Sequence, residues 1–272
     1  MTQDSEKEIL QRIQSALESA RSVLSRFTAG AIEAEYKAGQ DPVTEADKSV
    51  DAVLHKELLR TGEGWLSEET VDDFSRLSHE RVWVVDPLDG TREFVAGIPE
   101  FCVSVALVDN GRAVAGGICN PVTNEIFLGS LNSGVTYNEK PARCAQRKSL
   151  RDARVLASRS EVNRGEWQQF AGAPFEIHRM GSVAYKLALV SAGLADATFT
   201  LVPKHEWDIA AGAALVESAG GFVSTLENTP LRFNQKQPLV SGLIAGGAFL
   251  QEPLLSLLEP HINSRCHDEN TS

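Results

Sequence analysis

Hydrophobic residues recur at helical spacing in the N-terminal part of the chain. Between residues 5 and 28 they follow one another every three or four positions, at Ile9, Ile13, Leu17, Ala20, Leu24 and Phe27. A second helix is predicted from Thr44, because Thr44 and Asp47 have the spacing of an N-cap and its partner. Its apolar stripe continues at Val50, Val53, Leu54 and Leu58. The pattern therefore predicts two amphipathic helices.

Strand patterns dominate the next part of the chain. The stretch 64–69 reads as a short strand that ends in two acidic residues, and further strands are predicted at 82–86, 101–109, 113–121, 124–130 and 134–138. Asn110 and Gly111 are typical of a hairpin turn. Beyond residue 154, strands are predicted at 155–160, 195–202 and 222–226, and helices near 163–171, at 181–193 and at 208–221.

The order of these elements indicates the fold class. Strands and helices are mixed without a strict alternation, which favours an α/β (mixed α+β) fold, a layered α-β-α-β-α sandwich, over a barrel. The basic, irregular stretch from Lys140 to Arg154 is the predicted boundary between two subdomains, 1–145 and 146–265. The remaining residues, 266–272, are predicted to be a disordered tail.

Charge and cysteine content narrow the function classes. The formal net charge is −11, which disfavours binding to nucleic-acid polymers and to anionic membrane surfaces. The four cysteines, Cys102, Cys119, Cys144 and Cys266, match no zinc or redox spacing and are expected to be buried and reduced. No signal peptide and no membrane-length apolar run is apparent, so a cytoplasmic location is expected.

The segment 86–91, Asp-Pro-Leu-Asp-Gly-Thr, carries the first candidate chemistry. Pro87 predicts that the preceding strand ends at Asp86, and Gly90 allows the backbone to approach a ligand closely. The following residues can open a helix, whose free N–H groups attract an anion. Two carboxylates beside an anion site make sense if Mg²⁺ bridges them to a phosphate, since Mg²⁺ prefers oxygen ligands.

Three more acidic residues are candidates for the same site. Glu68 follows a predicted strand, Asp208 opens a predicted helix of small residues, and Asp47 lies in the first turn of another. Taken alone, Asp47 and Asp208 are better explained as acids that complement a helix dipole, and Glu68 as a solvated loop residue. The segment 86–91 alone also fits an ordinary turn.

Four motifs together give a stronger indication. The segments D-P-V-T-E-A-D (41–47), S-E-E (67–69), D-P-L-D-G-T (86–91) and W-D-I-A-A-G (207–212) resemble, in order and spacing, those of the inositol monophosphatase superfamily. The resemblance spans residue 9 to about residue 250. It implies a Mg²⁺-dependent, lithium-sensitive phosphatase of small phosphate esters that forms a homodimer.

The resemblance also implies roles for individual residues. Glu68, Asp86 and the backbone carbonyl of Leu88 would hold one Mg²⁺, and Asp86, Asp89 and Asp208 a second. A weaker third ion would lie near Glu68 and Asp47. A metal-activated water would be positioned by Glu68 and by Thr91, whose hydroxyl is polarised by Asp47. The phosphate would contact the metals and the backbone around Leu88, Asp89, Gly90 and Thr91.

The substrate is a separate question. Inositol monophosphatases carry a Glu seven residues before the last metal ligand, where this chain has Leu201. The segments D-G-T-R-E-F (89–94), A-S-R-S (157–160) and G-S-V-A-Y-K (181–186) resemble those of 3′(2′),5′-bisphosphate nucleotidases. The resemblance implies substrate contacts at Arg159, Ser182 and Lys186, together with Asp208, and favours conversion of 3′-phosphoadenosine 5′-phosphate to AMP.

Other functions stay open at this point. Arg159 is equally explained as a surface residue at a strand end, and Lys186 as a lysine whose stem packs on its own helix. An inositol, sugar or histidinol phosphatase is the alternative substrate class. A non-catalytic regulatory protein is the alternative of another kind, but such a protein would be free to lose metal ligands that this chain retains.

Overall fold

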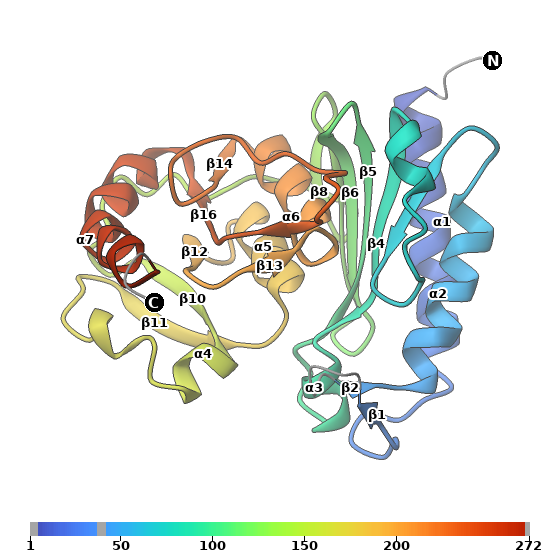
Figure 1. Cartoon of the computed structure of the whole chain (residues 1–272), viewed down its shortest axis with the longest axis horizontal. Coiled ribbons are helices and arrows are strands. Elements are labelled where there is room, and N and C mark those ends of the chain that lie inside the picture. Colours follow the sequence, from blue (N-terminus) through green and yellow to red (C-terminus); the bar gives the residue numbers. More distant parts are fainter. Residues whose placement is uncertain (1–4, 37–41, 270–272) are drawn as a thin grey trace.

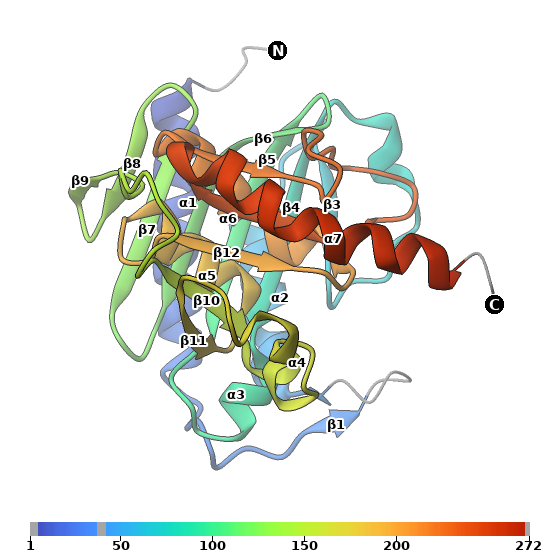
Figure 2. The same ribbon diagram turned by 90° about the vertical axis from the view of Figure 1, so that its left-hand side faces the viewer.

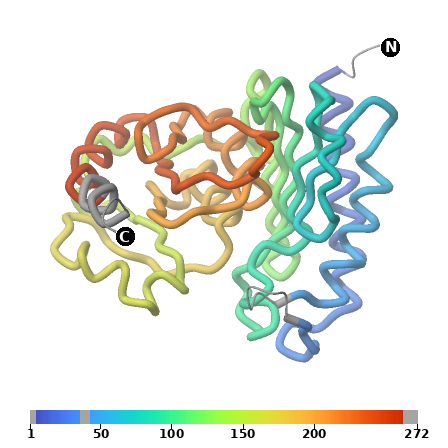
Figure 3. Tube along the Cα trace, in the orientation of Figure 1, coloured from blue at the N-terminus to red at the C-terminus, as the bar shows by residue number. Residues whose placement is uncertain are grey.

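The computed structural model describes residues 5–36 and 42–269. Its elements lie in five layers, helix, sheet, helix, sheet and helix, which Figure 1 shows side by side. The tube in Figure 3 shows the first half of the chain, from blue to green, on one side of the molecule and the second half, from yellow to red, on the other. The layered mixed α+β sandwich predicted from the sequence is confirmed.

Helices α1 (Glu6–Leu24) and α2 (Glu45–Leu58) form the first layer. Each begins with a capping box, from Ser5 to Glu8 in α1 and from Thr44 to Asp47 in α2, as the spacing at Thr44 predicts. Their apolar faces pack against one face of the first sheet. Helix α1 ends at Leu24 and so stops short of Phe27, the last residue of the predicted stripe.

The first sheet has seven strands in the order β3-β4-β5-β6-β7-β8-β9, with β3 parallel to β4 and all other neighbours antiparallel. Strand β4 is buried on both faces: Trp83 and Val85 face α1 and α2, whereas Val82 and Val84 face the middle layer. The strand bounds are β3 Gly64–Ser67, β4 Arg81–Asp89, β5 Cys102–Asp109, β6 Arg112–Asn120, β7 Glu125–Ser130, β8 Gly134–Tyr137 and β9 Lys140–Ala142.

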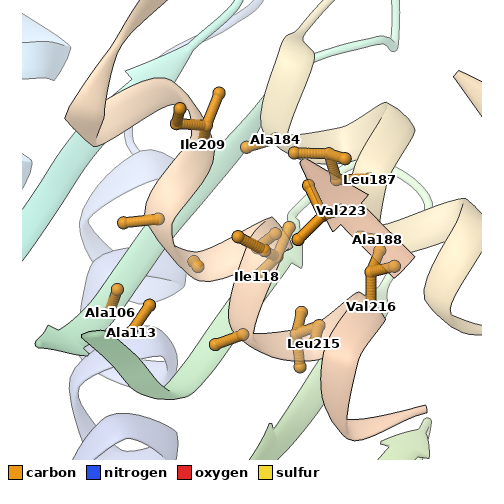
Figure 4. Packing of buried hydrophobic residues seen from close by; sticks show 14 of the residues in the cluster. Ala106, Ala113, Ile118, Ala184, Leu187, Ala188, Ile209, Leu215, Val216 and Val223 are labelled. Atoms are coloured by element: carbon orange, nitrogen blue, oxygen red, sulfur yellow. The ribbon is translucent and has the colours of Figure 1, made fainter. Parts of the chain in front are cut away.

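The middle layer consists of α5 (Val183–Ser191) and α6 (Glu206–Ser218). Figure 4 shows side chains from both helices meeting Ala106, Ala113 and Ile118 of the first sheet and Val223 of the second. The packing is close: a Cβ on Gly116 would lie 2.6 Å from the Ala211 carbonyl oxygen of α6. Small residues in α6 therefore let the helix approach the sheet.

The second sheet has five strands in the order β11-β10-β12-β16-β14. Strands β10, β11 and β12 are parallel, and β16 runs antiparallel to its neighbours. Helix α7 (Gln251–Glu269) lies across the outer face of this sheet, where Leu254 and Leu258 join the third core cluster (Figure 2). The strand bounds are β10 Arg154–Ser158, β11 Glu176–Met180, β12 Ala197–Thr200, β14 Gly221–Ser224 and β16 Leu243–Gly247.

Short elements complete the chain. Strand β1 pairs with β2, and β13 pairs with β15. Their bounds, with those of the short helices, are β1 Glu35–Tyr36, β2 Pro42–Val43, β13 Lys204–His205, β15 Leu239–Val240, α3 Thr91–Val95, α4 Arg159–Asn163, η1 Ser75–Ser78, η2 Gln168–Phe170 and η3 Ala248–Leu250.

Several elements differ from the sequence prediction. The helix expected near 163–171 is wrong: the chain forms α4 and η2, and Gly165 between them adopts a φ of +82° that breaks a helix. Strands β11 and β16 and helix α7 were not predicted. Because α7 extends to Glu269, residues 266–269 are helical, contrary to the predicted disordered tail, and 270–272 lie outside the described residues.

The predicted division into two subdomains stays a prediction. The first sheet ends at Ala142 and the second begins at Arg154, but α5 and α6 contribute to one core cluster that touches both sheets. Cys102, Cys119 and Cys144 are buried and free, as predicted, and the side chain of Cys266 lies outside the described part. Among the described helices, none is both long enough and apolar enough to span a bilayer.

Candidate metal centre and active site

The end of β4 supplies two acidic residues through an interruption in the strand. The pairing of β4 with β5 shifts register between Asp86 and Asp89, so β4 continues past Pro87 and the predicted strand end at Asp86 is wrong. Oδ1 of Asp86 accepts a hydrogen bond from the Leu88 N–H at 3.0 Å. This irregularity turns both carboxylates toward the same end of the strand.

Asp208 joins them from the middle layer. It is the third residue of α6, and its Oδ2 accepts a hydrogen bond from the His205 N–H at 2.9 Å, which anchors it at the helix start. One carboxylate oxygen each from Asp86, Asp89 and Asp208 lies within 4.8 Å of the others. Asp86 and Asp89 are buried, so water screens their charges poorly.

The electrostatics of this cluster are unfavourable for the protein alone. Burial, with the negative charges of Glu68, Asp89 and Asp208, raises the pKa of Asp86 well above its usual value. Burial and the charges of Asp89 and Glu68 raise the pKa of Asp208 in the same way. Burial also raises the pKa of Asp89, although hydrogen bonds from Ser182 and Ala184 oppose the shift. The cluster lacks enough positive charge of its own.

The donor set fits a hard divalent cation. Among the described residues, Oδ2 of Asp86 is buried and has no hydrogen-bond partner. A buried carboxylate oxygen without a partner costs free energy that a bound cation would recover. Oxygen ligands from carboxylates are those that Mg²⁺ prefers. Asp86, Asp89 and Asp208 would therefore hold the ion.

Glu68 lies at the same cavity but is not in the tight group of three. It directly follows β3, which is parallel to β4, and its N–H donates to the Val85 carbonyl at 3.4 Å. Its charge raises the pKa of both Asp86 and Asp208, so its carboxylate lies close to theirs. The structure thus brings Glu68 to the edge of the cluster, where the sequence placed it.

Thr91 and Asp47 form a buried pair beside the cluster. The Thr91 hydroxyl lies 3.0 Å from Oδ1 of Asp47 and 2.9 Å from the Leu88 carbonyl oxygen. The other oxygen of Asp47 accepts hydrogen bonds from the backbone and the hydroxyl of Thr44, at 2.8 and 2.5 Å. Burial raises the pKa of Asp47, and these hydrogen bonds oppose that shift. The capping box of α2 thereby fixes the carboxylate that holds Thr91.

Gly90 makes the turn between β4 and α3. Its φ is +97°, a left-handed conformation, and a Cβ there would lie 2.9 Å from the Glu100 carbonyl oxygen. No other residue fits without moving this backbone. The first N–H groups of α3 begin at Thr91 and have no intrahelical acceptor, so they can face an anion.

These residues line a cavity of about 270 Å³ between the two halves of the chain. The acidic cluster and Thr91 line it. Three cationic side chains, those of Lys186, Lys204 and Arg159, line the same cavity. His205 and Trp207 also line it, with stacked rings whose centroids are 4.3 Å apart and whose planes make an angle of 6°. The cavity therefore offers anionic, cationic and aromatic surface to one ligand.

Three residues that were predicted to contact the substrate make hydrogen bonds within the protein. The Ser182 hydroxyl donates to Oδ2 of Asp89 at 2.7 Å, and Ser182 has a φ of +52° that is rare for a residue with a side chain. Arg159 Nη2 lies 2.6 and 2.7 Å from the two oxygens of Glu100. Lys186 Nζ donates to the Ser182 carbonyl at 2.9 Å. Burial lowers the pKa of Lys186 to about 8.

Two further residues bear on the substrate: Leu201, which the sequence singled out, and Lys204, which sequence reasoning missed. Leu201, which stands where inositol monophosphatases have a Glu, is buried in the third core cluster and does not line the cavity. Lys204 does line it, and its Nζ lies 3.2 Å from Oε1 of the buried Glu161. Lys204 was not predicted because an isolated lysine before an aromatic segment carries no motif. Its position appears only once β13 pairs with β15.

Three converging carboxylates in a cavity, beside free N–H groups at a helix start, fit a metal-dependent phosphomonoester hydrolase. The model of the inositol monophosphatase family matches residues 4–263, and the chain belongs to this family. Members of the family are metal-dependent phosphomonoester hydrolases, and the chain is an enzyme of that class.

Relatives and solved structures agree with this assignment. The chain is 33% identical to an inositol-1-monophosphatase of Mesorhizobium japonicum, over 93% of this chain and 96% of the relative. It is 37% identical to the Nus factor SuhB of Xylella fastidiosa, over 77% and 78%. The crystal structure of CysQ from Bacteroides thetaiotaomicron, a bacterial member of the family, superposes with a TM-score of 0.73 and 28% identity, over 89% and 98%.

Proposed function

We propose that this protein is a Mg²⁺-dependent phosphatase that hydrolyses a 3′(2′),5′-bisphosphate nucleotide, with 3′-phosphoadenosine 5′-phosphate as the substrate. The observation that carries the substrate class is the presence of three cationic side chains, Lys186, Lys204 and Arg159, in the cavity that holds the acidic cluster. A bisphosphate carries a second anionic group that needs such a partner, whereas a simple monoester does not.

The acidic residues of the cavity have the first role, which is metal binding. Asp86, Asp89 and Asp208 would hold Mg²⁺, with Glu68 and the Leu88 carbonyl at the edge of the same site. When bound, Mg²⁺ lowers the pKa of water and neutralises charge that grows on the phosphoryl oxygens.

The remaining active-site residues position the reacting groups. Glu68 and Thr91 orient the attacking water, and Asp47 keeps the Thr91 hydroxyl in place. The N–H groups after Gly90 receive the phosphoryl oxygens. A third, weaker ion near Glu68 and Asp47 is part of the proposal.

The second phosphate is assigned to the lysines, with Lys186 in the principal role. The Arg159 guanidinium already donates to both oxygens of Glu100. We therefore assign Arg159 a smaller part in binding the second phosphate. Lys204 pairs with Glu161 through a single contact and is placed to shift toward an anion. The stacked rings of His205 and Trp207 offer a flat surface to a nucleobase.

A substrate panel tests this proposal. Phosphate release from 3′-phosphoadenosine 5′-phosphate, inositol 1-phosphate and histidinol phosphate is measured with and without Mg²⁺. Lys186→Ala and Lys204→Ala should reduce kcat/KM for the nucleotide by roughly tenfold or more, and for the monoesters by much less. Lys148→Ala is the matched control, since Lys148 lies over the ring of Phe249 and not at the cavity. Equal losses on all three esters would refute the role of the lysines.

Inositol 1-phosphate is the second candidate, because the Mesorhizobium japonicum relative is named for it. A higher kcat/KM for this ester than for the nucleotide would reverse the ranking. Another relative is named a Nus factor, so we keep a regulatory role as the alternative of another class. Mg²⁺-dependent release of phosphate distinguishes that role from an enzyme. We further propose that the enzyme is a cytoplasmic homodimer and that lithium inhibits it. Sedimentation measures the oligomeric state.

A further inference from the structure

Arg76 and Glu206 are fully buried, and both form hydrogen bonds with the same short segment of the chain, residues 234–238. The first lies in η1, at the end of the loop that begins with Glu68. The second lies in the first turn of α6, two residues before Asp208. Segment 234–238 thus stands between the two parts of the chain that carry these acids.

Arg76 holds one side of this segment. Its Nη1 donates to Oδ1 of Asn234 at 2.7 Å, and its Nη2 donates to the Gln235 carbonyl at 2.9 Å. The remaining donors reach the carboxylate of Asp72 at 2.8 to 3.1 Å. The Asn234 side-chain amide donates back to the Arg76 carbonyl at 3.3 Å. The guanidinium therefore fastens the Glu68 loop through several contacts in a fixed geometry.

Glu206 holds the other side. Its two carboxylate oxygens accept hydrogen bonds from the N–H groups of Asn234 and Gln235, at 2.6 and 2.9 Å. Its own N–H donates to the Pro238 carbonyl at 3.0 Å. Charged acceptors make hydrogen bonds about twice as strong as neutral ones. The start of α6 is therefore fixed to segment 234–238 by backbone and side chain together.

We call Arg76, Glu206 and segment 234–238 together the bridge. It connects the two halves of the molecule. The loop from Glu68 to Arg76 follows β3 of the first sheet, while Glu206 and segment 234–238 belong to the second half of the chain (Figure 1). Phe233, the residue before this segment, contacts the turn between β5 and β6 of the first sheet: its N–H donates to the Gly111 carbonyl at 3.0 Å.

We propose that Arg76 and Glu206 are positioning residues that set the distance between Glu68 and Asp208, and with it the affinity of the site for Mg²⁺. Neither residue touches the cavity, so each acts through the chain segment that it holds. A site that assembles from two halves of a molecule loses affinity when the halves move apart, because the ligands no longer converge on one ion. The inference rests on the proposed metal site but not on the identity of the phosphate ester.

The experiment compares Arg76→Lys, Glu206→Gln and Glu206→Ala with the wild type. Mg²⁺ binding is measured by isothermal titration, and phosphate release is measured over a range of Mg²⁺ concentrations. Because Arg76 and Glu206 act on the metal ligands only through segment 234–238, we expect Arg76→Lys and Glu206→Ala to weaken Mg²⁺ binding by roughly tenfold, the low end for groups bonded directly to a ligand. Both variants should retain most of kcat at saturating Mg²⁺. Glu206→Gln keeps one acceptor oxygen and should restore part of the affinity.

Arg12→Lys is the matched control. Arg12 is also a buried arginine paired with a glutamate, Glu63, but it lies in α1 and has no contact with segment 234–238. It should lower the melting temperature and leave Mg²⁺ affinity unchanged. If both bridge residues act on one segment, the double variant Arg76→Lys/Glu206→Gln should lose less affinity than the product of the two single losses.

The outcomes separate the bridge from the metal site itself. Asp208→Asn should lose Mg²⁺ binding whether or not the bridge matters. Wild-type Mg²⁺ affinity in both Arg76→Lys and Glu206→Ala, beside a loss in Asp208→Asn, would overturn the bridge and leave the site intact. Normal Mg²⁺ affinity in Asp208→Asn would overturn the site. If Glu206→Ala does not fold, Arg76→Lys alone decides in the same way.

Discussion

Replacing Asp86 by Asn should make the metal-free protein more stable and the enzyme inactive. Asp86 is buried at the centre of the acidic cluster, and no positive side chain is among the main influences on its pKa. Asn keeps the shape and can still accept the hydrogen bond from the Leu88 N–H. The change thus removes a buried negative charge and little else.

The magnitude follows from the geometry of the cluster. Oxygens of Asp86, Asp89 and Asp208 lie within 4.8 Å of one another. At an effective dielectric constant of about 20, each such pair of charges repels by roughly 3.5 kcal/mol. Proton uptake by one carboxyl limits the total, so we expect a gain of about 3 kcal/mol in the free energy of unfolding. For a protein of this size that corresponds to a rise of roughly 6–12 °C in Tm.

Thermal unfolding at pH 8 is measured in EDTA and again with Mg²⁺. The wild type should gain about 2.7 kcal/mol at a Mg²⁺ concentration a hundredfold above Kd, and Asp86→Asn should gain almost nothing. Asp196→Asn is the control: Asp196 is also buried, but it pairs with Arg147 and accepts from the Arg154 N–H, so its loss should destabilise. A fall in Tm for Asp86→Asn in EDTA would refute the electrostatic reasoning.

Three further predictions concern the same site. Asp89→Asn and Asp208→Asn should each lower kcat by at least about a thousandfold without unfolding the protein, as circular dichroism would show, and near-normal turnover would contradict the ligand assignment. Thr91→Ala should lower kcat by roughly a hundredfold and leave KM little changed, because the hydroxyl bonded to Asp47 orients the water. Thr91→Ser, which keeps the hydroxyl, should be near wild type. A change confined to KM would exclude that role. The raised pKa values of Asp86 and Asp208 mean that the folded state binds protons that the unfolded chain releases. The free energy of unfolding in EDTA should therefore increase as pH falls from about 8 toward 5, and a decrease over the same range would contradict this reasoning. Saturating Mg²⁺ should weaken the trend but not abolish it, because burial also raises the pKa of Glu206, outside the metal site, to about 7.

Much of the fold could be predicted because its signals are local. The capping box at Thr44 and the turn at Asn110 and Gly111 depend on neighbouring residues, and each appears as predicted. The strand β16 and the helix α7 were not predicted, because their apolar residues pack against distant parts of the chain rather than following a clear period.

The candidate site divides in the same way. The acidic residues could be found because the segment 86–91 places two of them within one turn, and the remaining motifs supply the others. Lys204 could not be found, since it reaches the cavity only through pairing with a strand more than thirty residues later. Arg159 combines both kinds of signal: its place in the sequence indicates a substrate contact, and in the structure it lines the cavity and pairs with Glu100 from a distant loop.

The close packing of α6 has a consequence for how the enzyme can change. A Cβ on Gly212 would lie 2.4 Å from the Leu187 side chain, and a Cβ on Gly116 would collide with the backbone of the same helix. Any enlargement at either glycine would shift α6 along its length and carry Asp208 out of register. Directed evolution toward new esters should therefore sample the rim positions Ser160, Lys204 and His205, and leave these two glycines untouched.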